Sequence, residues 1–288
     1  MMQLIILLLL PFLFTGLINK LKAILVGKQG ASIFQQYYDF IKLIQKGEVI
    51  SNTTSFIFKI APTINLSCTI VAAIILTLFH FEGDFILFAY LLALGKFLSV
   101  LAAMDTGSSF EGMGAAREVS YTSFVEPAFF IIVSSICALK GIYSFESLYS
   151  LFGVQTSLIS VIIIMVLFMM ILIEGSRTPI DDPKTHLELT MIHEVMVLDN
   201  SGVDLAFINY ASALKMLLFS TLIANIVAGS NIFGYLLAYS VVAICIALIE
   251  TVGARIRLTH IIEYTFLMIS FALVVMSLML SSVFKGGF

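Results

Sequence analysis

The sequence predicts an all-α membrane protein with about eight transmembrane helices. Of its 288 residues, 60% are hydrophobic and only 11% are charged, and the mean hydropathy is +1.08. A soluble domain usually carries about 25% charged residues, so water could not hold this chain folded. The apolar residues come in runs of roughly 20, the length at which a helix crosses about 30 Å of hydrocarbon.

The apolar runs place the transmembrane helices in order along the sequence. The first run looks like a signal peptide, but no basic residues precede it and no small-residue cleavage pattern follows, so we expect an uncleaved span. Residues 1–288 are expected to form a single transmembrane domain with little room for a soluble one. The expected spans are residues 2–19, 56–79, 85–104, 120–139, 156–174, 205–228, 232–251 and 259–283.

Basic residues alternate strongly between the segments that connect these spans. The side that holds Lys140 and Lys285 has no other basic residue outside the spans. By the positive-inside rule, we expect the basic segments to be cytoplasmic, both termini to be outside, and the protein to lie in the inner (cytoplasmic) cell membrane. The three long inward segments are residues 20–55, 105–119 and 175–204. The basic residues predicted to share the cytoplasmic side are Lys20, Lys22, Lys28, Lys42, Lys46, Lys59, Arg117, Arg177, Lys184, Arg255 and Arg257.

The first inward segment contains an amphipathic pattern at helical spacing. The apolar residues of the pattern fall on one face and the polar residues on the other, which is typical of a helix lying in the membrane interface or against a partner protein. The pattern leaves both options open. The apolar face is Ile33, Tyr37, Ile41 and Ile44, and the polar face is Gln35, Asp39, Lys42 and Lys46.

The second inward segment is rich in glycine and serine, which are expected to break the helix before the next span. Gly112 and Gly114 are too close together for a nucleotide-binding loop, and we expect them to permit close approach of two backbones. Four acidic residues lie in or beside the membrane here: Asp105, Glu111, Glu118 and Glu126.

The third inward segment is the longest polar stretch of the sequence. Pro179 and Pro183 are expected to hold its start extended. Thr185–Glu188 has the pattern of a capping box that opens a short helix. That helix would carry a polar stripe of His186, Thr190, His193 and Glu194. We therefore expect an ordered surface that faces a partner.

No pattern in the sequence predicts a metal site or a hydrolytic active site. The pair His193-Glu194 lacks the second histidine of a metalloprotease helix, because residue 197 is valine. His186 and His193 would stand about 10 Å apart along a helix axis, an awkward gap for two ligands of one ion. The cysteines occur singly, which argues against an iron-sulfur centre. We expect no cofactor on this protein.

Three ionisable residues, Lys96, Glu126 and Lys215, fall inside predicted spans. A charge at the centre of a membrane helix costs roughly 2.5 to 3.5 kcal/mol on insertion scales. Two explanations stay open: a fixed ion pair or snorkelling to the interface, and a path for protons or cations. The first is favoured for Glu250 and Glu263, which lie near span ends.

The third segment resembles a known protein family. Glu174-x-x-Arg177-x-Pro179-x-Asp181, followed by Glu188-Leu189 and Ser201-Gly202, resembles the central loop of the H-subunit family of respiratory complex I, which belongs with the NADH dehydrogenases. The string DDPKTHLELTMIHE resembles the branch found in formate hydrogenlyase and other energy-converting membrane-bound nickel-iron hydrogenases. Similar matches occur at Gln35, Asp39, Lys42 and Leu43, at DTGSSF and GAARE, and at Arg255-x-Arg257 with Glu263.

The resemblance implies a non-catalytic, membrane-anchor and ion-coupling subunit of such an oxidoreductase complex. Its partners would be hydrogenase large and small subunits, iron-sulfur subunits, antiporter-like membrane subunits and membrane lipid, with no nucleic acid. The nickel-iron centre and iron-sulfur clusters would belong to the partners. Electron transport there would be linked to proton or sodium translocation. Alternatives are the quinone-site subunit of complex I, a free-standing ion transporter and a purely structural anchor.

The resemblance also assigns residues to these roles. An ion pathway would use Glu118, Glu126, Lys96 and Lys215. A partner-docking loop would use Glu174, Arg177, Asp181, Asp182, His186, Glu188 and Glu194. Two positions depart from the family pattern: Ser212 stands where the complex I branch has a glutamate, and Glu111 stands where the hydrogenase branch has a glycine.

Overall fold

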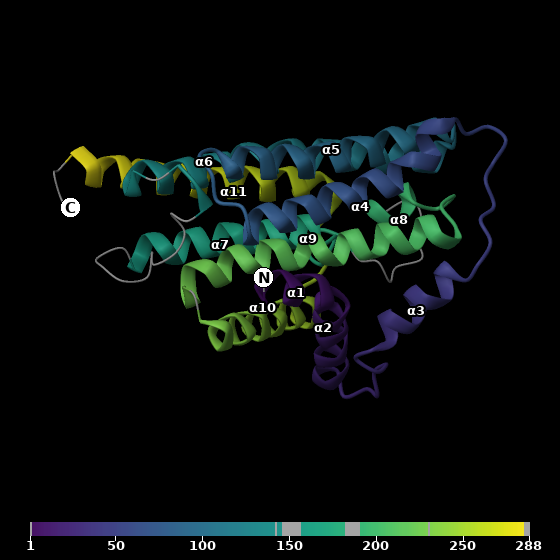
Figure 1. Cartoon of the computed structure of the whole chain (residues 1–288), viewed down its shortest axis with the longest axis horizontal. Helices are drawn as coiled ribbons and strands as arrows, with labels where there is room; N and C mark the ends of the chain where they lie inside the picture. The colour runs from purple at the N-terminus through teal and green to yellow at the C-terminus, as the bar shows by residue number, and fades with distance from the viewer. Residues whose placement is uncertain (1, 142, 146–156, 182–190, 230, 285–288) are drawn as a thin grey trace.

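A computed structural model describes residues 2–141, 143–145, 157–181, 191–229 and 231–284, and within these ranges the protein is helical with no strand. The described helices are α1 (Met2–Leu9), α2 (Pro11–Leu25), α3 (Gln35–Ile44), α4 (Phe56–Thr77), α5 (Asp84–Asp105), α6 (Ser109–Lys140), α7 (Ser157–Glu174), α8 (His193–Met196), α9 (Gly202–Ala228), α10 (Ile232–Val252) and α11 (Leu258–Phe284). Most of them run side by side along the long axis of the molecule, and α3 stands apart (Figure 1).

The helix lengths confirm a protein that crosses the membrane many times. In the described part of the sequence, 6 helices are long and apolar enough to span a bilayer, namely α4, α5, α6, α9, α10 and α11. The bent pair of α1 and α2 would raise this number to 7. The apolar part of α7, Leu158–Glu174, is shorter. The predicted eighth span therefore stays a prediction.

The first predicted span is not one straight helix over residues 2–19. It is broken between Leu9 and Pro11, and the two pieces are bent by 55°. Proline cannot donate a helix hydrogen bond and its ring clashes with the preceding turn, which explains the position of the break. The carbonyl of Leu9 accepts a hydrogen bond from the Tyr37 hydroxyl, and that of Leu8 accepts one from the Tyr210 hydroxyl at 2.6 Å. Side chains thus satisfy backbone groups at the break.

The second inward segment is mostly helical, and the expected break before the next span lies at residues 106–108, where Gly107 has a φ of +69°. Gly112 and Gly114 do not interrupt the helix that follows. α6 begins at Ser109 and continues through both glycines to Lys140. A Cβ atom at Gly114 would lie 3.0 Å from the carbonyl oxygen of Ile192 and 3.1 Å from the nitrogen of Met196. Gly114 therefore permits the close backbone approach that the sequence suggested, whereas a Cβ at Gly112 would meet nothing within 4 Å.

The predicted cytoplasmic segments lie together at one end of the bundle. The Ser55 N–H donates to the Asp105 carboxylate at 2.6 Å, which joins the first segment to the second. The Ile256 N–H donates to the Pro179 carbonyl at 2.9 Å, which joins the third segment to the turn before α11. This grouping agrees with the charge alternation, and the side of the membrane stays a prediction.

A separate contact fixes the opposite end. The Gly83 N–H donates to the Tyr143 carbonyl at 2.7 Å, so the turn before α5 lies against the residues after α6. The fully buried Asp84 carboxylate accepts the Phe145 N–H at 2.9 Å and 3.1 Å. Asp84 therefore has a structural role in joining two connections.

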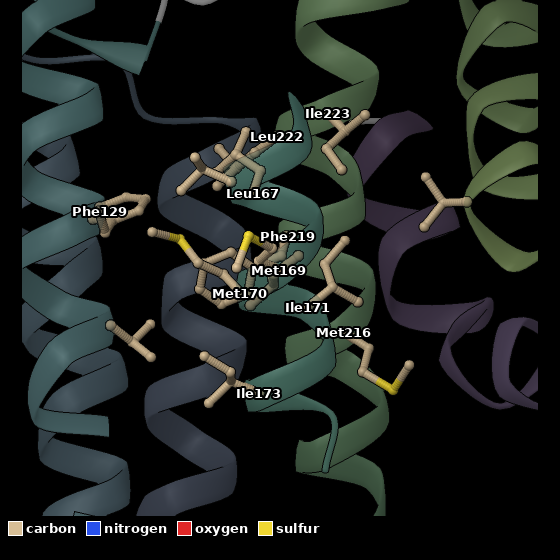
Figure 2. Close-up of a cluster of buried hydrophobic side chains, with 14 of the residues drawn as sticks. Phe129, Leu167, Met169, Met170, Ile171, Ile173, Met216, Phe219, Leu222 and Ile223 are labelled. Atoms are coloured by element: carbon tan, nitrogen blue, oxygen red, sulfur yellow. The ribbon is translucent and has the colours of Figure 1, made fainter. Parts of the chain in front are cut away.

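α9 is the most buried of the six spanning helices, with 83% of its most apolar stretch inside the bundle. It packs against α7 through Met216, Phe219 and Leu222, opposite Leu167 and Ile171 (Figure 2). Lipid is as apolar as leucine, so membrane helices associate through close packing and hydrogen bonds. A helix enclosed in this way is the place where a buried charge is best shielded from lipid.

α3 confirms the predicted helix in the first inward segment. Its Phe40 ring lies 5.2 Å from Phe12 and 5.8 Å from Tyr210, measured between ring centroids. Several large apolar side chains of α3 stay exposed, including Ile41 and Ile44. The helix is thus attached along one side only, and both the membrane and a protein partner stay open as what covers its free side.

Candidate functional site

Four helices bring together a group of charges, which we call the intramembrane cluster and of which all but Glu126 are largely buried: Lys96, Glu118, Glu174, Glu126 and Lys215. The Lys96 ammonium lies 2.7 Å from Glu174 and 3.2 Å from Glu118. The Lys96 side chain is 14% exposed and each carboxylate side chain 9% exposed. One lysine therefore holds two carboxylates from different helices, which offsets the cost of taking them out of water.

The other two members of the cluster have no such pairing. Lys215 on α9 is 6% exposed and feels the charges of Lys96, Glu118 and Glu174, yet it forms no ion pair with another described residue. Glu126 on α6 is exposed at the side of the bundle and shares a cavity of about 30 Å³ with Lys96 and Glu174. The cluster thus extends from the bundle interior to its lateral surface.

A second group of charges, the loop ion network, joins the third inward segment to two other parts of the protein. It contains Lys22, Arg177, Asp181, Glu250 and Arg255. Glu250, whose side chain is 3% exposed, accepts from Lys22 and from Arg177, each at 3.2 Å. Arg255 donates to Asp181 at 2.9 Å. Three segments distant in sequence, at Lys22, at residues 177–181 and at residues 250–255, are thereby fixed to one another.

Asp181 also binds backbone groups of its own segment. Its second oxygen accepts the N–H groups of Ile192 at 3.1 Å and His193 at 3.0 Å. Residues 178–180 form a turn in which Ile180 donates to the Arg177 carbonyl at 3.0 Å, so this start is not extended as expected. A continuous helix from residue 185 to Glu194 is also wrong, because Met191 and Ile192 are not helical and Asp181 takes the Ile192 N–H.

The predicted docking residues divide into separate groups. Asp182, His186 and Glu188 lie outside the described residues. The side chains of Glu174, Arg177 and Asp181 are buried and bonded within the protein, and their role in docking a partner stays a prediction. Unpaired charges are costly at a membrane boundary, and these three side chains are paired within the protein. Glu194 is half-buried, has no ion pair with a described residue and borders a cavity.

That cavity, which we call the polar cavity, has a volume of about 300 Å³ and lies between α2, α3, the turn after α7, α8 and α9. Its lining is mostly polar and charged. Ser212 is one of the residues that line this cavity. It stands at the position where the complex I branch of the family has a glutamate. The polar lining residues include Thr15, Asn19, Gln36, Asp39, Ser176, Arg177, His193, Glu194, Asn209 and Ser212.

Sequence reasoning missed some buried acids and their partners. Glu111 is fully buried and accepts the Asp199 N–H at 2.9 Å, while its other carboxylate oxygen has no hydrogen-bond partner. Glu111 therefore holds the segment before α9 against the first turn of α6. Glu250 stood out in the sequence as a charge in an apolar helix, but its partner Lys22 lies 228 residues away. Among the described residues, no three His, Cys, Asp or Glu side chains gather as a metal site.

Residues 1–283 match the NADH dehydrogenase family, and the protein belongs to this family. It is 30% identical to Hydrogenase-4 component C of Escherichia coli (strain K12) over 228 residues, 76% of this sequence and 71% of that protein. It is 29% identical to Formate hydrogenlyase subunit 4 of the same organism over 121 residues, 40% of this sequence and 39% of that protein. The resemblance seen in the third segment is thus confirmed.

The fold is similar to that of a solved membrane protein. A subunit of the membrane-bound sulfane sulfur reductase, described as an archaeal respiratory membrane complex, superposes with a TM-score of 0.79. The match covers 96% of each of the two proteins at 16% sequence identity. At this identity the likeness shows a shared helical architecture.

Proposed function

We propose that this protein is the membrane-anchor and ion-coupling subunit of a membrane-bound nickel-iron hydrogenase or formate hydrogenlyase. The observation that carries this proposal is the intramembrane cluster, in which Lys96 bridges Glu118 and Glu174 inside the bundle. Acidic and basic groups within membrane spans typically mark proton or ion paths. The two hydrogenase relatives support the choice of complex.

In this function, the protein itself carries no redox group. Soluble hydrogenase large and small subunits with iron-sulfur subunits would hold the nickel-iron centre and clusters and dock at the end of the bundle where the inward segments gather. Antiporter-like subunits would lie beside it in the inner membrane, with both termini of this subunit outside. Electron transfer in the docked subunits changes the charge near the cluster, and the cluster responds by taking up or releasing an ion.

Replacing Glu126 or Glu174 by glutamine tests the coupling role. Each variant removes one titratable group and keeps nearly the same volume. We expect both complexes to assemble and to evolve hydrogen, while the ions moved per hydrogen fall by about fivefold or more, because an ion path fails without its titratable groups. The measurement is ion uptake by inverted membrane vesicles during hydrogen evolution, with and without a protonophore or a sodium ionophore.

A matched control is S134A, on the same helix as Glu126. Ser134 is exposed and its hydroxyl donates to the Ile131 carbonyl at 3.2 Å in its own helix. This variant should transport like the parent. Unchanged ion movement in E126Q and E174Q would instead favour a purely structural anchor. A quinone rather than a hydrogenase large subunit bound at the third segment of the purified complex would exclude the hydrogenase assignment.

A further inference from the structure

The polar cavity and the smaller cavity beside Lys96 are lined by neighbouring residues at the end of α7 and on α9. The polar cavity ends at Gly175 and Met216, while the smaller cavity beside Lys96 is bordered by Glu174 and Phe219. Glu174 and Gly175 are neighbours in sequence, and Met216 and Phe219 lie one turn apart on α9. The same two strips of backbone therefore border both cavities, with the polar cavity on one side and the intramembrane cluster on the other.

Met216 lies against Gly175 at this place. Its side chain is only 1% exposed and lies so close to Gly175 that a Cβ atom there would be 2.6 Å from the Met216 Cγ and 2.7 Å from its sulfur. Figure 2 shows Met216 on α9 next to Ile171 of α7, one turn from Phe219. Glycine at position 175 allows the methionine to fill the gap between the two helices.

The polar cavity and the intramembrane cluster both carry polar or charged groups, whereas the Met216 side chain is apolar. The polar cavity offers hydroxyl, amide, carboxylate and imidazole groups that suit water. On the other side, Lys96 and Glu174 are charged and Lys215, the residue before Met216, forms no ion pair with a described residue. A short apolar constriction between two polar spaces stops water and ions by remaining dry.

Methionine is well suited to a barrier that opens. Its side chain is unbranched, has three rotatable bonds and adapts to irregular gaps. A rotation of this side chain into the polar cavity would uncover Glu174 without any movement of the helices. A branched leucine of similar size would fill the gap with less freedom to rotate.

We propose that Met216, seated against Gly175, is the closed gate between the polar cavity and the intramembrane cluster. Water and the protons it carries pass from the cavity to Glu174 only when the Met216 side chain moves. This inference rests on the proposed ion-coupling function and adds to it an entry route and the residue that controls it.

The first test measures passive proton leak in vesicles that contain the whole complex and no electron donor. M216A removes the barrier, and we expect its proton conductance after a pH jump to rise about tenfold over the parent, as for a constriction that becomes wet. M216L keeps the gap filled and should leak no more than the parent. Equal conductance in M216A and the parent would overturn the gate.

The second test needs no transport and reports on water directly. In a protein whose Cys68, Cys137 and Cys245 are replaced by alanine, F219C places a thiol in the small cavity and S212C places one in the polar cavity. A small methanethiosulfonate reagent should modify S212C quickly in every background. It should modify F219C slowly with Met216 present, about tenfold faster with M216A and slowly again with M216L, because the thiolate reacts only where water reaches it.

The labelling result separates this inference from the proposed function. If F219C reacts equally fast with and without Met216, the gate is wrong, whatever E174Q does to ion movement. If labelling responds to M216A while E126Q and E174Q transport normally, the barrier stands but the proposed ion-coupling function fails. Loss of transport in E174Q with an unresponsive F219C keeps the function and rejects the gate.

Discussion

The loop ion network and the intramembrane cluster are both buried, both ionic and both built from distant segments, but they differ in completeness. In the loop ion network, Glu250 has two cationic partners and Asp181 has one cation and two backbone N–H groups. In the intramembrane cluster, Lys96 is shared by two carboxylates while Lys215 and Glu126 form no ion pair with a described residue.

The difference indicates which group holds the fold and which can change its state. A carboxylate with every lone pair satisfied has no reason to exchange its proton or its partners, and breaking its bonds strands buried charges. In a cluster with one lysine between two glutamates and a second lysine nearby, the glutamates have more than one cation with which they could pair. Rearrangement within the cluster is therefore the feature that ion coupling needs.

The largest expected effect comes from breaking the loop ion network at Glu250. E250A leaves Arg177 and Lys22 without their shared partner inside the protein. We expect the free energy of unfolding to fall by about 3 to 5 kcal/mol, the usual result of removing one side of a buried ion pair. Thermal unfolding of the detergent-solubilised complex measures this loss.

E263Q is the control for that measurement. Glu263 is 72% exposed at its side chain and pairs with His260 in the turn of its own helix. Exposed pairs of this kind contribute about 0 to 1 kcal/mol, so the unfolding temperature should hardly move. A loss in E250A no greater than in E263Q would show that the loop ion network does not hold the fold.

A smaller loss is expected for D181N. Asparagine retains an oxygen that can accept both backbone N–H groups, although more weakly than a carboxylate, and its NH2 group replaces the charged oxygen opposite Arg255. We expect a loss of about 1.5 to 3 kcal/mol, the range for hydrogen bonds to charged groups. Hydrogen exchange of the amides at Ile192 and His193 should rise at the same time. Unchanged exchange there would contradict the role of Asp181 as the anchor of the loop.

The smallest effect on stability is expected when the whole buried part of the intramembrane cluster is removed at once. In the variant K96M/E118M/E174M/K215M no buried charge is left behind, and apolar groups of similar volume fill the same space. Replacing a complete buried ionic group in this way is often neutral, or stabilising by about 1 to 4 kcal/mol.

The same variant should move no ions while hydrogen evolution continues in the presence of an ionophore. K96M alone is the informative comparison, because it strands Glu118 and Glu174 and should unfold more easily than the fourfold variant. If the fourfold variant were the less stable of the two, the cluster would be a structural element like the loop ion network.

Much of the architecture could be predicted from local features of the sequence. Spans near Phe56, Asp84, Gly202, Ile232 and Leu258 begin within three residues of the expected positions. Hydropathy works here because every backbone group in a membrane must be satisfied within its own helix. The break at Pro11 and the helix through Gly112 were harder to predict, because proline and glycine are tolerated in some membrane helices and interrupt others.

The candidate site was predicted only in part. Lys96 and Lys215 stood out because charges are rare in apolar spans, and the family resemblance added Glu118. The structure places all three around Glu174. From the sequence, Glu174 was assigned to the docking loop, because a residue at the end of a span can belong to the loop or to the membrane interior. The polar cavity had no signal of its own, since its wall combines residues from five separate parts of the sequence.

The sequence by itself determined that this protein is a membrane bundle and which of its segments share one end, because apolar length and basic-residue bias act locally on each span. Only the tertiary structure decided which charges pair. Glu250 finds Lys22 across 228 residues, and Met216 meets Gly175 between two helices. Ion pairing and gap filling depend on distances of a few ångströms between side chains, and those distances exist only after the helices pack.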